Sequence, residues 1–292
     1  MIVNKIAIGT SGFHKVSKKE LFKFLDRARS LGIETLDTSP VYGNAEQLIG
    51  EYTRLNGNTY NVMTKLGLKD YREFNSRSLV IKFEKTLESL RRNSVQTLFL
   101  HSVPYKYFSE DLLSGLLKLK SEESVERIGY SGDNEDLDFA IRSECFDDFM
   151  VSMNLLDMSN ITSLEKMSTE KMLYVKRPLA NAVWKNWHFN ICKFHFYRTL
   201  GARRTQDTHN YFFRYKIRRK SLPDTSELPQ SFLKFVASIP INKTIVIGTT
   251  DLDHLKLANS LLSNPFFIDT KYFSENLEKW KEDNKFQWRA MR

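Results

Sequence analysis

The stretch KIAIGTSGFHKVSKKELFKFLDRARSLGIETLDT (residues 5–38) contains the pattern that decides the fold. It opens with a short apolar run, Lys5–Thr10. The tetrapeptide Ser17–Glu20 follows, and the serine and glutamate at its two ends have the spacing of a helix capping box. Apolar residues then recur at helical spacing up to Gly32, a residue type that commonly ends helices. A second apolar run, Thr35–Thr38, comes next, so the stretch predicts a strand, a helix and a second strand.

The same alternation continues along the chain. Seven of the eight apolar runs are nearly continuous, which indicates strands buried on both faces, as in a parallel sheet. Eight strand–helix units predict an α/β fold, a (β/α)8 TIM barrel. A doubly wound open sheet is the alternative, and the count of eight and the even spacing favour the barrel. The expected strands are Lys5–Thr10, Thr35–Thr38, Asn61–Lys65, Thr97–His101, Arg127–Ser131, Phe149–Met153, Leu173–Arg177 and Thr244–Gly248. The expected helices after the first are Asn44–Leu55, Ser78–Arg92, Ser109–Lys120, Asp133–Arg142, Ser159–Thr169, Glu227–Ala237 and Asp251–Leu262.

One interval is much longer than the others and contains residues 184–220, here called the basic–aromatic segment. We expect residues 1–292 to form a single barrel domain in which this segment is an enlarged loop after the seventh strand. Such loops emerge at the carboxyl-end face of a barrel, where active sites form. A C-terminal extension, residues 264–292, contains a charged helix expected over Lys271–Arg292, either packed on the barrel or over its mouth.

The basic–aromatic segment holds ten basic residues, ten aromatic residues and one acidic residue, so it carries the whole net charge of +9. Three interpretations stay open. The segment folds over a dinucleotide with cations on phosphates, or it binds an anionic substrate or polymer, with nucleic acid the least favoured. In the third, the aromatic residues are core and the cations form a solvated surface.

Composition excludes several classes of protein. The chain has 292 residues and is 41% hydrophobic, which is ample for a folded core. It has no long apolar stretch that predicts a membrane span, and its first residues lack the apolar region of a signal peptide. Cys145 and Cys192 form no disulfide framework and no metal motif, which favours the cytoplasm and a site without metal.

Polar residues stand where three successive expected strands end. Asp37 ends the second strand, Lys65 the third and His101 the fourth, and Tyr42 follows Asp37 in the next turn. Each alone has an ordinary structural interpretation, as a cap, a solvated lysine or a hydrogen-bonding histidine. The carboxyl ends of parallel strands meet at one face of a barrel, so we expect these four residues to lie close together. As a set, they predict a catalytic group.

These residues carry a resemblance to the aldo-keto reductase family. LDTSPVYGNAEQLIGEY (36–52) resembles the family signature around its Asp and Tyr, and Lys65 and His101 match the rest of its tetrad. Further similar stretches are RIGYSG (127–132), SMNLLD (152–157), VKRPLAN (175–181) and VIGTTDLDHL (246–255). The resemblance covers roughly residues 1–183 and 240–262. It implies NAD(P)H-dependent reduction of an aldehyde or ketone to an alcohol, or the reverse.

The chemistry of the four residues agrees with that activity. Carbonyl reduction needs a hydride at carbon and a proton at oxygen, and Tyr42 is the candidate general acid. Lys65 beside it would favour the phenolate and lower the phenol's pKa. Asp37 would keep Lys65 charged and oriented. His101 would hydrogen-bond the carbonyl oxygen.

The resemblance also implies a cofactor site. Gly9, Thr10 and Ser11 would lie near the nicotinamide with Asp37, and Ser131 would bind its carboxamide. Lys176 would lie where the ring stacks, and Arg177, Pro178 and Leu179 would follow the pyrophosphate. Gly248, Thr249, Thr250 and His254 would hold the adenosine end, where helix N–H groups bind phosphate.

Several positions depart from the family pattern. Gly132 replaces a usual Asn, Met150 a usual Gln, and Lys176 a usual aromatic residue. Gly248 replaces a frequent Lys, and Leu257-Ala258 replaces Glu-Asn. These changes leave a modest preference for NADP(H) over NAD(H), and the basic–aromatic segment could supply the missing cations. The alternative is a weak or inactive barrel that binds a nucleotide or a partner. The expected substrate is a small carbonyl compound or alcohol, and the positive charge of the chain is compatible with an anionic one.

Overall fold

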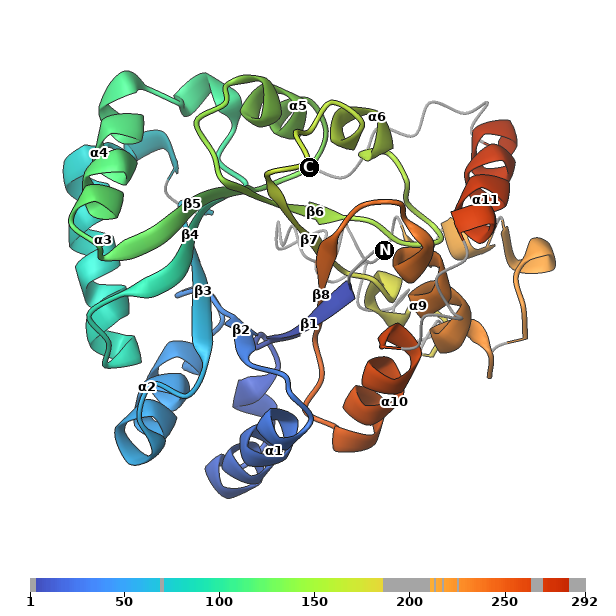
Figure 1. Cartoon of the computed structure of the whole chain (residues 1–292), viewed down its shortest axis with the longest axis horizontal. Helices are drawn as coiled ribbons and strands as arrows, with labels where there is room; N and C mark the ends of the chain where they lie inside the picture. The colour runs from blue at the N-terminus through green and yellow to red at the C-terminus, as the bar shows by residue number, and fades with distance from the viewer. Residues whose placement is uncertain are drawn as a thin grey trace, which may run out of the picture.

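The computed structural model describes residues 4–68, 71–185, 211–212, 214–216, 218–224, 226–263 and 270–283. Eight parallel strands close into a barrel in chain order, each paired with the next and the last with the first, as Figure 1 shows. The closed sheet confirms the predicted (β/α)8 barrel over the open-sheet alternative. The strands are β1 (Asn4–Gly9), β2 (Thr35–Asp37), β3 (Asn61–Leu66), β4 (Val95–His101), β5 (Val125–Ser131), β6 (Asp148–Ser152), β7 (Met172–Lys176) and β8 (Lys243–Ile247).

Helices surround the barrel on the outside (Figure 1). The Ser17–Glu20 capping box forms as predicted, with Glu20 N–H donating to Ser17 Oγ and Ser17 N–H donating to the glutamate. The α-helices are α1 (Lys18–Ser30), α2 (Ala45–Asn56), α3 (Ser76–Leu90), α4 (Glu110–Ser121), α5 (Asn134–Arg142), α6 (Ile161–Leu164), α9 (Leu228–Ser238), α10 (Leu252–Leu262) and α11 (Thr270–Asp283). The short 3-10 helices are η1 (Phe13–Lys15), η2 (Tyr71–Glu73), η3 (Tyr105–Tyr107), η4 (Ala180–Ala182) and η5 (Arg219–Ser221).

The helix expected over Ser159–Thr169 is wrong in extent, because α6 is a single turn. Asn160, just before it, donates from its side chain to Ser152 O (2.9 Å) and to Asp133 Oδ1 (2.8 Å). The segment is also rich in Ser and Thr, whose side chains offer the backbone alternatives to helical hydrogen bonds. Side-chain ties to the neighbouring strand thus replace a longer helix.

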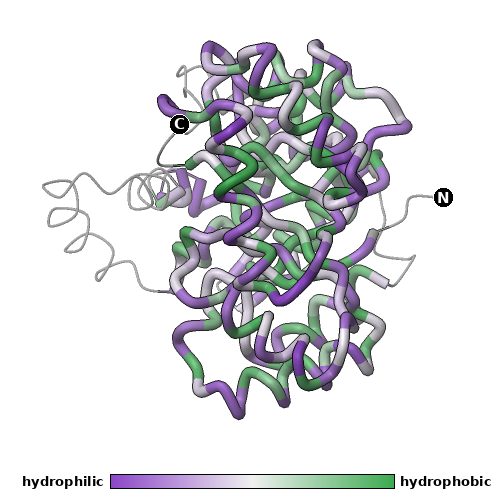
Figure 2. The backbone as a smooth tube through the Cα atoms, turned by 90° about the vertical axis from the view of Figure 1, so that its left-hand side faces the viewer, coloured by the Kyte–Doolittle hydropathy of each residue, from purple (hydrophilic) through white to green (hydrophobic). Residues whose placement is uncertain are grey.

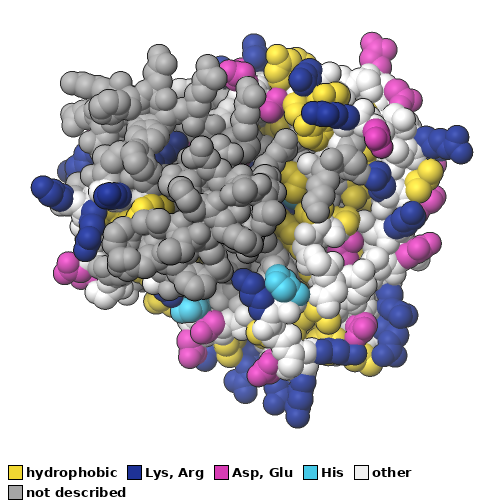
Figure 3. Space-filling view, turned by 180° about the vertical axis from the view of Figure 1, so that it is seen from behind, with side chains coloured by type: hydrophobic (Ala, Val, Ile, Leu, Met, Phe, Trp, Pro, Cys, Tyr) yellow, Lys and Arg dark blue, Asp and Glu magenta, His cyan; other side chains and the backbone are white. Residues whose placement is uncertain are grey.

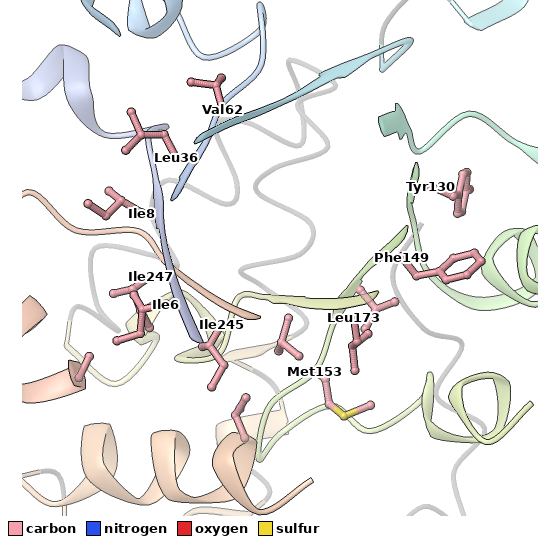
Figure 4. Close-up of a cluster of buried hydrophobic side chains, with 14 of the residues drawn as sticks. Ile6, Ile8, Leu36, Val62, Tyr130, Phe149, Met153, Leu173, Ile245 and Ile247 are labelled. Atoms are coloured by element: carbon pink, nitrogen blue, oxygen red, sulfur yellow. The ribbon is translucent and has the colours of Figure 1, made fainter. Parts of the chain in front are cut away.

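Successive residues of each strand pack alternately into two separate apolar layers, one outside the barrel and one inside it. Residues such as Ile6, Ile8 and Val62 pack outward against the helices, as Figure 4 shows for part of this layer. The residues between them point into the barrel, because successive side chains of a strand lie on opposite faces. The inner apolar cluster consists of Ala7, Met63, Phe99, Met150, Tyr174 and Val246. Burial on both faces accounts for the continuous apolar runs in the sequence.

The next inward positions toward the carboxyl ends are polar. In three strands, a polar residue stands two positions after an inner apolar residue. Lys65 follows Met63, His101 follows Phe99 and Lys176 follows Tyr174 in this way. Asp37 and Ser131 occupy the matching ends of β2 and β5. The barrel interior therefore changes from an apolar layer to a layer of ionisable and hydroxyl groups at its carboxyl-end mouth.

Helix α11 packs against α9 on the side of the barrel. The rings of Phe235 and Phe273 lie 5.6 Å apart, and Lys234 Nζ lies 4.6 Å from the centre of the Tyr272 ring. Of the helix expected over Lys271–Arg292, residues 284–292 lie outside the described part, as do residues 264–269 of the extension.

Hydrophilic and hydrophobic residues alternate at short intervals along the described chain (Figure 2). Within the ranges that the structure describes, no helix is both long and apolar enough to cross a membrane.

Lys243 is a fully enclosed lysine at the start of β8, at the barrel end opposite the mouth. It is 1% exposed, and its Nζ donates to the carbonyl oxygens of Ala237 (3.2 Å), Ile239 (2.8 Å) and Ile241 (3.0 Å). These carbonyls belong to the end of α9 and the turn after it. Burial lowers the pKa of Lys243 to about 7.

The Lys243→Met variant is expected to change how stability depends on pH. Between pH 7 and 10 the unfolded chain binds a proton at Lys243 that the folded chain releases, so this group adds stability as pH rises. The free energy of unfolding of the wild type, relative to the variant, should therefore increase by about 2 kcal/mol from pH 7 to pH 9. Urea unfolding at several pH values measures this difference, and a constant difference would contradict the lowered pKa.

Candidate active site

The structure brings the four predicted catalytic residues together at the mouth. Asp37 ends β2, Lys65 lies in β3 and His101 ends β4, and the turn after β2 carries Tyr42. Lys65 Nζ forms an ion pair with Asp37 Oδ1 and lies 5.1 Å from the centre of the Tyr42 ring. The Tyr42 and His101 rings are 6.3 Å apart and meet edge to face. Groups from three successive strands thus form one cluster.

Lys65 is held as a buried ammonium. Its side chain is 2% exposed, and besides Asp37 it donates to Thr38 O at 2.9 Å. Burial alone would lower the pKa of Lys65, but Asp37 and Tyr42 outweigh it and raise that pKa above its ordinary value. The lysine therefore stays charged next to the tyrosine.

His101 is held as a neutral imidazole. Burial, and then the positive charges of Lys65, Lys176 and Arg177, lower its pKa well below the usual range. Its Nδ1 lies 3.4 Å from Ser39 Oγ, a hydroxyl that also reaches Lys65 O at 3.0 Å. Because Ser39 donates its one hydroxyl proton to Lys65 O, its oxygen accepts from Nδ1–H in this arrangement.

A second polar cluster lies beside the first, at the ends of β5 and β7. Lys176 Nζ is 3.4 Å from Ser131 Oγ and 3.4 Å from Asp133 Oδ2. Arg177 Nη1 donates to Ser152 Oγ at 3.2 Å, and Ser152 Oγ donates to Asp133 Oδ2 at 3.1 Å. Sequence reasoning singled out Ser131, Lys176 and Arg177 but saw Asp133 only as the start of a helix, since no motif marks it.

The second cluster brings two cations near the Asp133 carboxylate. Burial would raise the pKa of Asp133, but Lys176 and Arg177 outweigh it and lower that pKa, so Asp133 is ionised. Burial, with Arg177 and Lys65 adding to it, lowers the pKa of Lys176 against the opposing effect of Asp133. Lys65 and Asp37 likewise pair opposite charges at the mouth.

The other residues predicted near a nicotinamide lie at the end of β1. Thr10 is fully buried, and no described group forms a hydrogen bond with its Oγ1. A Cβ at Gly9 would lie 3.2 Å from Val246 Cγ1, whereas a Cβ at Gly248 would meet nothing within 4 Å. Ser11 follows in the next turn. This rim therefore combines hydroxyl groups and cations with a glycine that has open space beside it. Such a combination fits a nicotinamide dinucleotide.

The chain after β7 turns sharply. Arg177, Ala180, Asn181 and Ala182 all have φ between 43° and 56°, the left-handed region that non-glycine residues seldom adopt. Pro178 is buried and Leu179 is partly buried within this turn. Such strained backbone persists only where its surroundings hold it, and here it follows directly on the second polar cluster.

The start of α10 binds its own side chain. Asp251 Oδ1 accepts from the N–H groups of Asp253 (2.8 Å) and His254 (3.2 Å), and Asp251 N–H donates to Thr249 Oγ1 at 3.0 Å. Two N–H groups at this helix start, one of them from the predicted residue His254, are thus already bonded to a carboxylate. The predicted contacts of Gly248, Thr249, Thr250 and His254 with an adenosine end stay predictions.

Two departures from the family pattern have local structural reasons. A Cβ at position 132 would lie 2.4 Å from Tyr130 Oη, which donates to Val103 O at 3.0 Å, so only glycine fits beside this tyrosine. Met150 is 1% exposed and belongs to the inner apolar cluster. Sequence reasoning noticed both positions but not Tyr130, because the clash becomes visible only in three dimensions.

Part of the basic–aromatic segment is described, and it is anchored on the loop after β6. Arg214 Nη1 forms an ion pair with Asp157 Oδ1 (2.7 Å) and donates to Leu156 O (3.2 Å). Arg218 Nη1 donates to Leu155 O at 2.7 Å. Tyr211 is fully buried. Two of the ten cations are therefore structural, and residues 186–210 lie outside the described part.

The surface view from behind shows Lys and Arg side chains spread around the described edge, with Asp and Glu among them (Figure 3). No cluster of three or more His, Cys, Asp or Glu side chains able to hold a metal occurs among the described residues.

Comparison with known proteins gives one family. The sequence profile of the Aldo/keto reductase family matches residues 5–172. A stretch is 32% identical to D-arabinose 1-dehydrogenase of Saccharomyces cerevisiae, covering 36% of this chain and 34% of that protein. Another is 30% identical to aldo-keto reductase str7 of Strobilurus tenacellus, covering 42% of this chain and 38% of that protein. The matches thus span little more than a third of either relative. An aldo-keto reductase of Bacillus halodurans in its holo form superposes with a TM-score of 0.71 and 15% identity, covering 94% of this chain and 91% of that one.

Proposed function

Because this chain belongs to the aldo/keto reductase family, we propose that it is an NAD(P)H-dependent oxidoreductase that reduces an aldehyde or ketone to an alcohol, or catalyses the reverse. The observation that carries the proposal is the cluster of Asp37, Tyr42, Lys65 and His101 at the barrel mouth. Lys65 lies beside the Tyr42 ring and His101 faces it, an arrangement that supports a role in carbonyl reduction.

Tyr42 is the proposed proton donor. As the carbonyl oxygen gains negative charge, the phenol hydroxyl transfers its proton to that oxygen, and a phenolate forms. The Lys65 ammonium lies next to the ring and stabilises this phenolate. Asp37 and Thr38 O hold Lys65 in place, so no reorientation is needed during the reaction.

His101 is the proposed orienting group. Its lowered pKa keeps it neutral near pH 7, so it does not compete with Tyr42 as an acid. His101 would donate from Nε2–H to the carbonyl oxygen once Ser39 turns its one proton from Lys65 O to Nδ1. The two donors, Tyr42 and His101, would then hold one oxygen from two directions.

A nicotinamide dinucleotide supplies the hydride when bound. We propose that Gly9, Thr10, Ser11, Asp37 and Ser131 surround its nicotinamide end with Lys176. Arg177, Pro178 and Leu179 would follow the pyrophosphate, and Gly248, Thr249, Thr250 and His254 would approach the adenosine. Lys176 and Arg177 beside the mouth also suit a small anionic substrate. Because its two cysteines form no disulfide framework, we propose that the protein works in the cytoplasm.

Titration of the purified protein with NADPH and NADH, followed by tryptophan fluorescence, tests the proposal. We expect micromolar binding, with NADPH tighter than NADH and the difference shrinking as salt is added, because cations of the basic–aromatic segment would pair with the 2′-phosphate. Turnover of a panel of aldehydes and ketones with the tighter cofactor then tests catalysis. Equal affinities at all salt concentrations would contradict the NADP(H) preference.

A barrel that binds a nucleotide or a partner without turnover is the second candidate. The carboxylate of Asp251 on the first turn of α10 favours the partner-binding form of this candidate, because an acid there opposes a phosphate. Failure of both cofactors to bind a folded protein would support this candidate and contradict the oxidoreductase.

A further inference from the structure

We propose that the Ser39 hydroxyl sets which ring nitrogen of His101 carries the proton, and that this choice decides whether the site holds a carbonyl oxygen or an alcohol. Ser39 is a positioning residue in this role, because it acts through His101 and does not touch the substrate. The inference rests on the proposed function, in which Tyr42 and His101 hold the substrate oxygen between them.

The first step of the argument is the position of Ser39. It lies two residues beyond the end of β2 and is 1% exposed. Its Oγ lies 3.0 Å from Lys65 O on β3 and 3.4 Å from His101 Nδ1 on β4. A serine hydroxyl has one proton, so it donates to only one of these two groups at a time.

The second step is that a neutral imidazole has one N–H group and one bare nitrogen. His101 is neutral, because burial and nearby positive charges lower its pKa. When Ser39 donates to Lys65 O, its oxygen accepts from Nδ1–H, and Nε2 is bare. When Ser39 donates to Nδ1, the ring proton is on Nε2. The ring passes from one tautomer to the other by proton exchange with water, so its charge stays the same.

The third step is what each tautomer can hold. A carbonyl oxygen has no proton and accepts from both Tyr42 and His101, so it requires the proton on Nε2. An alcohol oxygen carries a proton of its own. The Lys65 ammonium beside the Tyr42 ring offers the phenol no acceptor, so the phenol donates to the alcohol oxygen. The alcohol proton then needs a bare Nε2 as its acceptor. The two forms of the substrate therefore require opposite tautomers of His101.

Nitrogen NMR of protein with isotope-labelled histidine tests the inference, and a His101→Gln variant identifies the His101 signals by their loss. Without substrate, the wild type should carry the ring proton on Nδ1, because Ser39 lies closer to Lys65 O than to the ring. Ser39→Ala should move the proton to Nε2, because a methyl group offers a buried Nδ1–H no acceptor. Ser39→Thr keeps a hydroxyl and should keep the wild-type tautomer.

The control variant is Ser102→Ala. Ser102 follows His101 directly, and its hydroxyl donates to Ser131 O at 3.3 Å. The substitution removes a hydroxyl next to His101 in the chain that does not bond to the ring, so the tautomer should not change.

Binding measurements test the consequence for the substrate. The aldehyde of the panel with the fastest turnover is titrated with oxidised cofactor bound, and its alcohol with reduced cofactor bound, so that no hydride is transferred. In the wild type, the ring proton should be on Nε2 with the aldehyde and on Nδ1 with the alcohol. Ser39→Ala should weaken alcohol binding by about tenfold, as expected for one lost hydrogen bond, and should leave aldehyde binding within a few-fold.

The outcomes separate the inference from the proposed function. One and the same tautomer in the wild type and in Ser39→Ala, or in the aldehyde and alcohol complexes of the wild type, overturns the inference and leaves the proposed function standing. Equal losses of aldehyde and alcohol affinity in Ser39→Ala do so as well. If the folded wild type turns over no aldehyde or ketone, the proposed function fails and the inference fails with it.

Discussion

Replacement of Tyr42 by Phe is expected to lower kcat for carbonyl reduction by at least about 100-fold, the usual contribution of a positioned general acid. The change removes one hydroxyl and keeps the ring that packs against Lys65 and His101. The Kd of the cofactor should therefore stay within a few-fold of the wild type. Steady-state rates and fluorescence titration of the same preparation measure both quantities.

The control for this variant is Tyr105→Phe. Tyr105 lies after β4 at the same rim and is 44% exposed, outside the cluster. It should keep the wild-type rate. A Tyr42→Phe variant with normal turnover would remove Tyr42 from the mechanism, and a variant that has lost cofactor binding would assign the tyrosine to binding.

Loss of one partner of the Lys65–Asp37 pair should cost stability as well as activity. Lys65→Met leaves the Asp37 carboxylate buried without its partner, and breaking a buried ion pair in this way typically costs about 3–5 kcal/mol. Turnover should fall at the same time, because the phenolate of Tyr42 loses its neighbouring cation. Denaturant unfolding and steady-state kinetics report the two effects separately.

The double variant Asp37→Asn with Lys65→Met separates structure from chemistry. It removes both charges, so most of the lost stability should return, whereas turnover should stay low. Recovery of turnover along with stability would mean that the pair serves only the fold. A stable Lys65→Met variant would mean that Asp37 finds another partner.

The barrel could be predicted from the sequence because its determinants are local and repetitive. Each strand lies within two residues of its predicted position, since burial on both faces leaves a continuous apolar run. The family assignment from the Asp37–Tyr52 stretch is confirmed by the family match. The tetrad was predictable because in-register parallel strands bring their ends to one face.

Other features of the structure could not be predicted, because they depend on contacts between residues far apart in the sequence. The single turn of α6 follows from the side-chain bonds of Asn160 to Ser152 and Asp133, which no helical periodicity reveals. The Lys176–Asp133 pair joins the ends of two strands that are not adjacent, so neither residue predicts the other. The ion pair of Arg214 with Asp157 could not be predicted either, because the sequence around Arg214 is typical of a charged surface.

The clash between a side chain at position 132 and the hydroxyl of Tyr130 has a consequence for how this sequence can change. An Asn at position 132 becomes acceptable only after the Tyr130 ring has been replaced by a smaller one, whereas the loss of the ring is compatible with Gly132. The two substitutions therefore have a required order. Any evolutionary or engineered path toward an Asn at position 132 has to pass through a variant that keeps Gly132 and has already lost Tyr130.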